Sequence, residues 1–189
     1  TNEREIQTAY RSVGGRKGLE FLDTEKVNAL AAEAGESSVK MLHAEHAPAG
    51  NMMVVLGSES GGTMVHEAIG HGLEGDAAEK GLSIYSGKIG ERVASELITV
   101  LDDATIAGKR GTYVFDDEGV PAQRTVPVEK GILKRYLLDR RIARSMGLES
   151  TGNGRRQNYR FRPIVRMSNT MIAPGNHSPD DIIASVDRG

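Results

Sequence analysis

Six consecutive residues carry the strongest signal for chemistry: His66-Glu67-Ala68-Ile69-Gly70-His71. Histidine nitrogens are common zinc ligands, and in the pattern H-E-x-x-H a glutamate beside two histidines acts as general base. Here the histidines are five residues apart instead of four. A regular helix turns by about 100° per residue, so this spacing separates the two side chains by about 140°. Both imidazoles can reach one ion only if the helix is distorted between them.

Two interpretations of this spacing are open. In the first, the motif is accidental, and the histidines and the glutamate lie on a solvated helix face. In the second, the helix departs from α geometry near Ala68 to Gly70, where a glycine tolerates a π-bulge or an early helix end. The second interpretation predicts a helix from about Gly62 to Gly72 that brings both imidazoles to one side.

The residues around the motif favour the second interpretation. Apolar residues recur at helical spacing and define one face, which leaves His66, Glu67 and His71 on the opposite arc. Glycines bracket the segment on both sides. A short helix that packs through its apolar face would therefore expose the three polar residues together. The apolar positions are Met64, Val65, Ala68, Ile69 and Leu73.

Several separate segments of the chain resemble the TldD/PmbA family, whose members are zinc metallopeptidases also called modulators of DNA gyrase. The resemblance runs from about Pro48 to the C-terminus. TldD-like members carry H-E-x-x-x-H and PmbA-like (TldE) members lack it, so the chain resembles the TldD-like branch. The motifs are HEAIGHGLEGD from His66, DDEG at Asp116 to Gly119, TGNGRR at Thr151 to Arg156, and MSNT at Met167 to Thr170.

The resemblance implies a role for each residue of the motif. His66 and His71 would be zinc ligands, and Glu67 would be the catalytic base. The family's third protein ligand is a cysteine in a C-terminal segment, whereas this chain contains no cysteine. Catalytic zinc usually has three protein ligands. We therefore expect the third ligand beyond Gly189, a chain that is a piece of a longer protein, weak or no zinc binding, and little activity in the piece alone.

Four further residues are candidates for supporting the metal or holding substrate. Glu74 and Asp76 follow the motif closely, and either could accept the second ring N–H of a zinc-bound histidine; a polar role at a helix end is the alternative. Asn153 lies in a glycine-rich turn where backbone could approach a substrate. Arg155 could grip a peptide carbonyl or carboxylate, because the guanidinium fork matches a carboxylate.

The segment 155–166 contains five arginines with two interleaved aromatic residues. Such a composition can bind single-stranded nucleic acid through phosphate contacts and stacking. A surface that binds peptide or a partner is favoured over nucleic acid. A plain structural role, as a charged loop beside a strand, is favoured over both. The acidic clusters Asp102-Asp103 and Asp116-Asp117-Glu118 could bind a hard cation, although Asp116 to Gly119 is more simply a hairpin turn. His43 and His46 form another candidate ligand pair.

Composition sets mild limits on function. The 189 residues carry a formal net charge of −2, which gives no general attraction to nucleic acid or membrane. No apolar run has the length of a membrane span, and the start has no signal-peptide pattern. The absence of cysteine excludes disulfides within the chain and fits a cytoplasmic location.

The order of predicted elements indicates an α+β fold with a mixed or antiparallel sheet. We expect an N-terminal segment, residues 1–47, with a long helix from a cap at Asp23 to about His46. Residues 48–189 would form the central part of a metallopeptidase domain with a short helix bearing the motif. Its predicted strands are 52–56, 96–101, 113–115, 123–128, 132–137 and 167–172, and its later helices cover 138–146 and a short segment capped at Ser178 to Asp181.

Taken together, the sequence predicts a zinc-dependent peptidase that hydrolyses unfolded or short peptides as part of a longer parent chain. The resemblance further implies a cleft shared with an identical or paralogous subunit, and we expect neither nucleic acid nor membrane as a partner. The alternative is a non-catalytic regulatory module that binds peptide or a partner protein. A pure scaffold has no reason to keep Glu67 between two histidines, which favours the peptidase.

Overall fold

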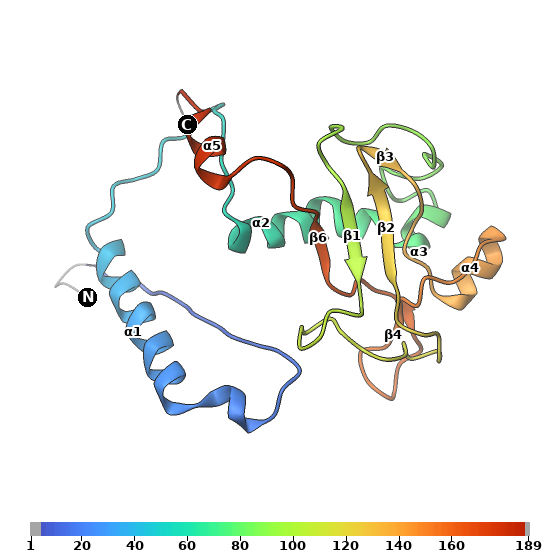
Figure 1. Cartoon of the computed structure of the whole chain (residues 1–189), viewed down its shortest axis with the longest axis horizontal. Helices are drawn as coiled ribbons and strands as arrows, with labels where there is room; N and C mark the ends of the chain where they lie inside the picture. The colour runs from blue at the N-terminus through green and yellow to red at the C-terminus, as the bar shows by residue number, and fades with distance from the viewer. Residues whose placement is uncertain (1–4, 188–189) are drawn as a thin grey trace. The chain divides into compact units, whose positions relative to one another are not determined.

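The computed structural model describes residues 5–187, with Glu59 described by its backbone alone. The chain forms two units, Thr1–Met52 and Met53–Gly189. Every described strand lies in the second unit, as does the histidine motif. Figure 1 shows the elements of both. None of the described helices combines the length and the hydrophobicity that a membrane crossing requires.

The first unit contains the predicted long helix. A 3-10 turn, η1 (Leu19–Leu22), precedes α1 (Thr24–Met41). The side chain of Asp23 caps α1 as predicted, by accepting the N–H of Lys26 at 2.8 Å. The prediction that the helix reaches His46 is wrong. Because α1 buries none of its residues, packing does not extend it beyond what its local sequence supports.

The second unit is built on a four-stranded antiparallel sheet with the order β3-β2-β1-β6, which confirms the α+β fold. Its strands are β1 (Val100–Asp103), β2 (Arg124–Glu129), β3 (Ile132–Leu133) and β6 (Thr170–Ile172). In β1, Val100 pairs with Ile172 of β6 and with Val128 of β2. A register shift between Val100 and Asp102 interrupts the β1–β2 ladder.

The predicted hairpin turn between β2 and β3 is present. Lys130 and Gly131 both have positive φ, 46° and 78°, as a two-residue turn between antiparallel strands requires. A side chain at position 131 would also meet the carbonyl of Ser95 at 2.7 Å. Glycine is therefore needed there for conformation and for space.

Three predicted strands are shorter or displaced. The strand expected at 96–101 begins only at Val100, because the N–H of Ile98 turns back to the Ser95 carbonyl. The strand expected at 132–137 ends at Leu133, because the N–H groups of Lys134 and Arg135 both bond to the Pro127 carbonyl and so interrupt the regular ladder with β2. The strand expected at 167–172 begins at Thr170, because Ser168 bonds to the carboxylate of Asp102.

Two predicted strands are absent. Residues 52–56 form no strand, and their apolar side chains are exposed; an apolar run becomes a strand only where a neighbour pairs with it, and no described segment does so here. At 113–115 only Phe115 forms an isolated bridge, to Pro121. Proline has no N–H to extend that ladder, and Asp116 turns the chain by accepting the N–H groups of Glu118 and Val120.

The later helices agree better with the sequence. In α4 (Arg140–Met146) the side chain of Asp139 caps the N-terminus, so the helix starts two residues later than predicted. Gly147, in the left-handed conformation, ends it. The terminal helix α5 (Pro179–Ala184) begins with the predicted Ser178 cap. A two-stranded sheet, β4 (Gly154–Arg155) with β5 (Ile164–Val165), was not predicted.

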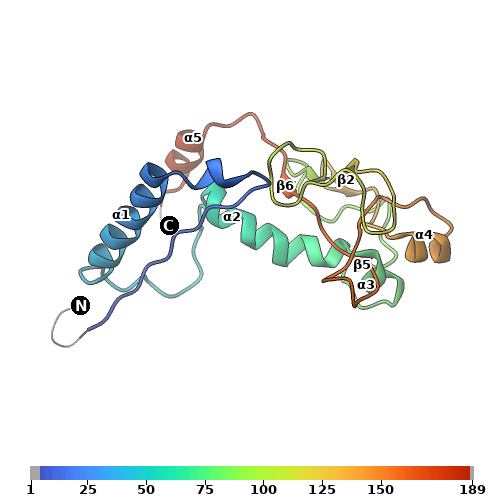
Figure 2. The same ribbon diagram turned by 90° about the horizontal axis from the view of Figure 1, so that it is seen from below.

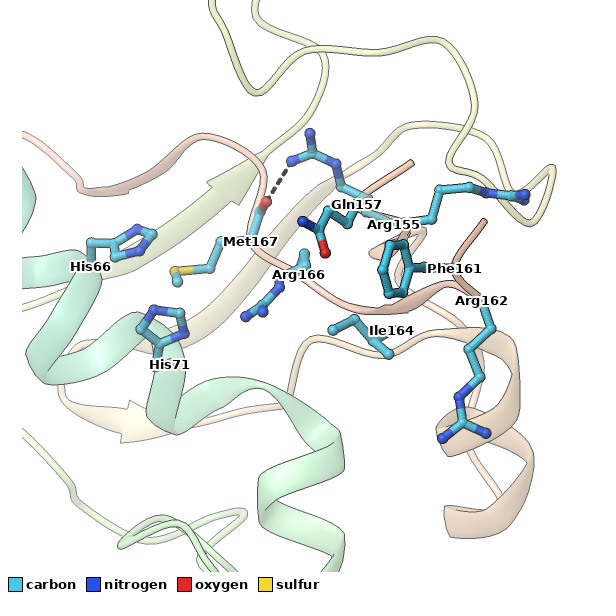
Figure 3. Close-up of a pocket in the computed structure, with 10 residues that line it drawn as sticks. His66, His71, Arg155, Gln157, Phe161, Arg162, Ile164, Arg166 and Met167 are labelled. Atoms are coloured by element: carbon cyan, nitrogen blue, oxygen red, sulfur yellow. Dashed lines mark hydrogen bonds between the residues drawn. The ribbon is translucent and has the colours of Figure 1, made fainter. Parts of the chain in front are cut away.

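The motif lies in one continuous helical segment that passes from α-helix to π-helix and then to a 3-10 turn. It begins as α2 (Ser58–Val65), passes through the π-helix η2 (His66–Gly70) and the 3-10 turn η3 (His71–Leu73), and is followed by α3 (Gly75–Glu79). Figures 1 and 2 show it crossing one face of the sheet, near β6. Figure 3 shows both histidines projecting from this segment toward Met167. The predicted departure from α geometry is confirmed.

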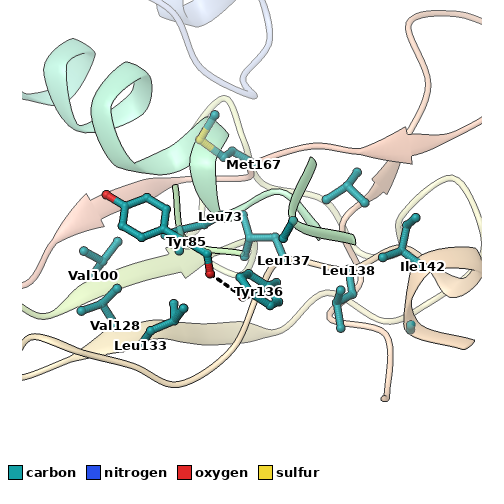
Figure 4. Close-up of a cluster of buried hydrophobic side chains, with 13 residues drawn as sticks. Leu73, Tyr85, Val100, Val128, Leu133, Tyr136, Leu137, Leu138, Ile142 and Met167 are labelled. Carbon is teal, nitrogen blue, oxygen red and sulfur yellow. Dashed lines mark hydrogen bonds between the residues drawn. The ribbon is translucent and has the colours of Figure 1, made fainter. Parts of the chain in front are cut away.

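The core lies between this segment, the sheet and α4 (Figure 4). Of the predicted apolar face, Val65 and Leu73 are buried and Ile69 is partly buried, whereas Met64 and Ala68 are exposed. The buried face is thus narrower than the sequence pattern indicates. The remaining core side chains include Val100, Val128, Leu133, Tyr136, Leu137, Leu138, Ile142, Val165 and Met167.

Candidate metal centre

The π-helix brings the two histidines together. The N–H of His71 bonds to the carbonyl of His66, five residues earlier, so one extra residue is accommodated within the turn. The ring centroids are 4.7 Å apart and the ring planes are inclined by 82°. One ligand atom from each of His66, Glu67 and His71 lies within 4.8 Å of the other two. The spacing that excludes a shared ion on a regular helix therefore permits one here.

A buried glutamate orients His71. The Nδ1 atom of His71 lies 3.0 Å from Oε2 of Glu74, and the Glu74 residue is only 7% exposed. The other oxygen, Oε1, accepts a hydrogen bond from Arg166 at 3.4 Å. With Nδ1 facing a carboxylate, Nε2 of His71 is the nitrogen left free to bind a metal ion. Glu74 is therefore placed as the sequence suggested for a residue that supports a metal ligand.

The backbone on both sides of Glu74 is tied to Leu137. The N–H of Leu137 donates to the Leu73 carbonyl at 2.9 Å, and the N–H of Gly75 donates to the Leu137 carbonyl at 2.8 Å. These bonds form a parallel bridge centred on Glu74. Leu137, the last residue of the strand predicted for 132–137, thus pairs with the motif segment and not with β2. The bridge fixes the carboxylate that faces His71.

Close packing holds the distorted turn in place. A methyl group on Gly70 would overlap the side chain of Met167, and one on Gly72 would lie 2.6 Å from the ring of Tyr85. The hydroxyl of Tyr85 also reaches the carbonyl of Ala68 at 3.5 Å. Glycines at these two positions thus let a methionine and a tyrosine approach the backbone of the turn. Burial raises the pKa of Tyr85, so its hydroxyl remains a neutral donor.

A cavity of about 680 Å³ opens beside the histidines. His66 and His71 line one side, and every other lining residue belongs to the segment 155–167 (Figure 3). That segment runs from the end of β4 through an exposed loop and β5 to Met167. The lining residues that it supplies include four arginines together with Phe161, Ile164 and Met167.

Arg155 and Asn153 hold different positions relative to this cavity. Arg155 lines it, donates to the Met167 carbonyl at 2.9 Å and lies 5.4 Å above the ring of Tyr113. Asn153 is 1% exposed and does not line it. Its amide instead donates to Asp102 Oδ2 at 2.8 Å and to the Arg166 carbonyl at 3.0 Å. Asn153 therefore supports the cavity wall from behind.

The other acidic candidates are engaged in local structure. Asp76 accepts the N–H of Ala77, and no hydrogen bond joins it to either histidine among the described residues. The side chain of Asp116 accepts the N–H groups of a turn and of Gly154. Asp102 is 2% exposed and accepts from Asn153, Ser168 and Thr170. Each carboxylate thus already has protein donors.

The Tyr113 ring, over which Arg155 lies, carries a partly buried hydroxyl group. The hydroxyl of Tyr113 donates to the carbonyl of Gly152 at 2.6 Å. Burial, followed by the charge of Asp102, raises the pKa of Tyr113 well above its usual range. The hydroxyl therefore stays protonated at neutral pH.

Comparison with known proteins decides the family. Residues 49–189 match the family model of the PmbA/TldA metallopeptidase C-terminal domain. The chain belongs to the PmbA/TldD family. The match covers both the π-helix with its histidines and the arginine-lined segment 155–167.

Relatives in this family are named metalloproteases. The chain is 48% identical to the metalloprotease TldD homologue of Haemophilus influenzae over 181 residues, which cover 93% of this chain and 38% of that protein. It is 44% identical to a metalloprotease of Methanocaldococcus jannaschii over 184 residues, 97% of this chain and 40% of the relative. The chain therefore spans about two fifths of the length of these curated PmbA/TldD relatives.

Solved structures of PmbA/TldD proteins share the fold. A Thermotoga maritima protein proposed to be a modulator of DNA gyrase superposes with a TM-score of 0.73 at 27% identity, over 85% of this chain and 36% of that one. TldE from Thermococcus kodakarensis superposes with a TM-score of 0.66 at 28% identity, over 84% and 37% of the two chains.

The residues present fit a metal ion. Imidazole nitrogens are ligands that zinc accepts, and the Glu67 carboxylate lies beside the two histidines. In a tetrahedral zinc site with zinc–nitrogen bonds of about 2.1 Å, two ligand atoms lie about 3.4 Å apart. The atoms of the three residues lie within 4.8 Å of one another, so the two imidazoles would have to draw closer around an ion. The partner of His71 Nδ1 is a further sign, because ligating histidines usually donate their second N–H.

Several residues that complete the site have no distinct signal in the sequence. Met167 was recognised only as part of a motif and strand, although it fills the space beside Gly70. Arg166 was recognised only as part of a basic tract, although it pairs with Glu74, 92 residues earlier. Leu137 and Tyr85 had no visible signal, because contacts between segments distant in the chain leave no local pattern.

The second candidate ligand pair, His43 and His46, lies beyond α1 in exposed, irregular chain.

Proposed function

We propose that the longer protein containing this chain is a zinc-dependent peptidase that hydrolyses unfolded or short peptides. The observation that carries the proposal is the π-helix, which places two imidazoles and a carboxylate within 4.8 Å of one another beside a cavity. A π-turn at this position has no evident structural purpose, and such turns are frequent at functional sites. The metalloprotease names of the relatives support the same reaction class.

In this proposal His66 and His71 hold the metal, with a cysteine from outside this chain as the third ligand. Zinc bound there polarises a carbonyl and lowers the pKa of water. Glu67 takes the proton from the attacking water and delivers it to the leaving amine. Glu74 keeps His71 in the tautomer that leaves Nε2 free, and Arg166 balances the charge of Glu74.

The peptide would lie in the cavity between the motif segment and the segment 155–167. The apolar residues Phe161, Ile164 and Met167 offer contacts to side chains of an extended peptide. We further propose that an identical or paralogous subunit completes the cleft. The similarity to TldE, a PmbA-like protein by name, supports a paralogue as one candidate.

Substitutions in the full-length parent test this function. Glu67→Gln should lower the cleavage rate of an unstructured peptide by a factor on the order of 10²–10⁴, because an amide cannot accept the proton. Zinc content should be unchanged. His66→Ala should lose both zinc and activity, because it removes a bond to the metal. If Glu67→Gln cleaves as fast as the unmodified enzyme at equal zinc content, the role of Glu67 is wrong.

The alternative of a non-catalytic binding module predicts a different result. In that case Glu67→Gln and His66→Ala would both leave the biological function of the parent intact. Any paralogous subunit should be present in the assay, so that an incomplete cleft does not imitate a scaffold.

A further inference from the structure

The described residues that line the cavity include several basic side chains and no acidic one. Arg155, Arg156, Arg162 and Arg166 all line it, and no aspartate or glutamate is among its described lining residues. Two of these arginines have carboxylate partners outside the lining. Arg166 pairs with Glu74 at 3.4 Å and Arg156 pairs with Asp117 at 3.6 Å. Those pairs leave the other two as the source of net positive charge.

Arg155 and Arg162 have no carboxylate partner among the described residues. Arg155 uses one N–H to donate to the Met167 carbonyl, and its guanidinium lies over the Tyr113 ring. These contacts hold the side chain in place while its further N–H donors stay unpaired. Arg162 makes no hydrogen bond and no ion pair with any described residue. Figure 3 shows Arg162 at the opposite end of the lining from the two histidines, with Arg155 and Phe161 between them.

We propose that this cationic part of the cavity binds a carboxylate of the peptide substrate, with Arg162 as its partner. The inference rests on the proposed peptidase function, and it adds a substrate class to it: peptides that carry a carboxylate at a distance from the bond cleaved at the histidines. An arginine fork matches a carboxylate in both charge and geometry. The carboxylate could belong to an aspartate or glutamate side chain or to the C-terminus.

The composition of the cavity favours a peptide over nucleic acid. Phe161, Ile164 and Met167 alternate with the arginines and give apolar contacts that peptide side chains can use. Single-stranded nucleic acid stacks successive bases on aromatic rings along a basic groove, whereas Phe161 is the one phenylalanine, tyrosine or tryptophan among the described lining residues. Tyr159 and Arg160 could supply such a surface, but neither lines the cavity, and they bond to each other at 3.0 Å.

Binding to the full-length parent tests the proposal without relying on catalysis. The metal is removed with a chelator, and fluorescence anisotropy follows four unstructured peptides of one length. The first carries an internal glutamate and a free C-terminus, the second glutamine in its place, the third an amidated C-terminus, and the fourth both changes. Losing the recognised carboxylate should weaken binding about tenfold, as expected for one charge-assisted contact. Weaker binding of the second peptide would identify a side-chain carboxylate as the recognised group, and weaker binding of the third would identify the C-terminal carboxylate.

Variants of the loop provide matched controls. Arg162→Gln should weaken binding of the recognised peptide by the same factor and have no effect on the peptide without carboxylates. Arg162→Lys should bind the recognised peptide more tightly than Arg162→Gln and less tightly than the unmodified protein, because it keeps the charge without the fork. Arg160→Gln changes an exposed arginine of the same loop outside the cavity, and it should bind as the unmodified protein does.

Three results would overturn the proposal. Equal binding of all four peptides would exclude carboxylate recognition. An equal loss in Arg160→Gln and Arg162→Gln would indicate a diffuse charge effect. Displacement of the peptide by a single-stranded oligonucleotide at lower concentration than by unlabelled peptide would assign the surface to nucleic acid. Failure of the peptidase function would appear separately, as an unchanged cleavage rate in Glu67→Gln, and would leave the binding result interpretable.

Discussion

Glu74 joins the two sides of the site at the level of single residues. One of its oxygens faces Nδ1 of His71 at 3.0 Å, and the other accepts from Arg166 at 3.4 Å. Its side chain is 9% exposed, whereas that of His71 is 39% exposed. A buried carboxylate needs such partners to remain ionised. Its position between an imidazole and a guanidinium makes Glu74 a positioning residue for His71.

We predict that Glu74→Gln lowers the metal affinity of the parent protein by about 10- to 100-fold, the usual effect of losing a partner of a ligating histidine. The amide keeps the shape but not the charge that holds the tautomer of His71. Competition with a chromophoric chelator measures the affinity. Asp76→Asn is the matched control, because Asp76 lies two residues away and bonds to the N–H of Ala77. Equal losses in both variants would show that Glu74 has no special role.

The motif segment shows how one helical element changes geometry to suit a site. It keeps the α form from Ser58 to Val65, gains one residue in the π-turn and tightens into a 3-10 turn at His71–Leu73. Met167 packs closely against Gly70, and Tyr85 packs closely against Gly72. The distortion is therefore maintained by neighbours that fit only this path of the backbone.

We predict opposite effects for two glycine-to-alanine changes in this element. Gly72→Ala should destabilise the chain by about 1–3 kcal/mol, because the added methyl overlaps the Tyr85 ring, which must move. Gly62→Ala should stabilise it by up to about 1 kcal/mol, because that position has open space and alanine favours helix. Thermal unfolding measures both. A Gly72→Ala protein as stable as the unmodified one would show that the turn is not held by Tyr85.

Within the second unit, Asp102 connects elements that are distant in the sequence. From β1 it accepts hydrogen bonds from Asn153, next to β4, and from Ser168 and Thr170, at the start of β6. Asn153 in turn holds the backbone of Arg166. The network thereby fixes the segment that forms the cavity wall opposite the histidines.

We predict that Asp102→Asn destabilises the chain by about 2–4 kcal/mol. The carboxylate accepts four hydrogen bonds in a buried position, and the NH₂ group of asparagine would face donors instead of accepting from them. Urea unfolding measures the loss. Asp187→Asn, at an exposed position, should change stability by less than about 0.5 kcal/mol. A similar small change in Asp102→Asn would contradict the structural role of the network.

A final prediction concerns metal retention by this chain compared with its parent. The chain contains two histidines and Glu67 at the site and has no cysteine. Two imidazoles with water are fewer protein ligands than catalytic zinc sites normally have. We expect zinc to leave the 189-residue chain during dialysis against a chelator and to stay in the parent. Stoichiometric, chelator-resistant zinc in this chain alone would show that it contains the full ligand set.

Local features were readable from the sequence by itself. The five-residue spacing of His66 and His71 with Gly70 between them predicted the departure from α geometry, because helix periodicity permits no other way to align them. The caps at Asp23 and Ser178 and the turn at Lys130-Gly131 were also predicted, since each depends on the chemistry of a few adjacent residues.

Only the tertiary structure decided which of the candidate residues meet. The carboxylate of Glu74 lies beside His71, whereas that of Asp76 bonds within its own helix. Arg155 lines the cavity, whereas Asn153 lies behind the cavity wall and bonds to its backbone. The tertiary structure left residues 52–56 unpaired, ended β3 at Leu133 and paired Leu137 with the motif segment. Strand pairing and burial depend on neighbours that are distant in the chain. A local sequence pattern does not show which of these neighbours a segment will contact.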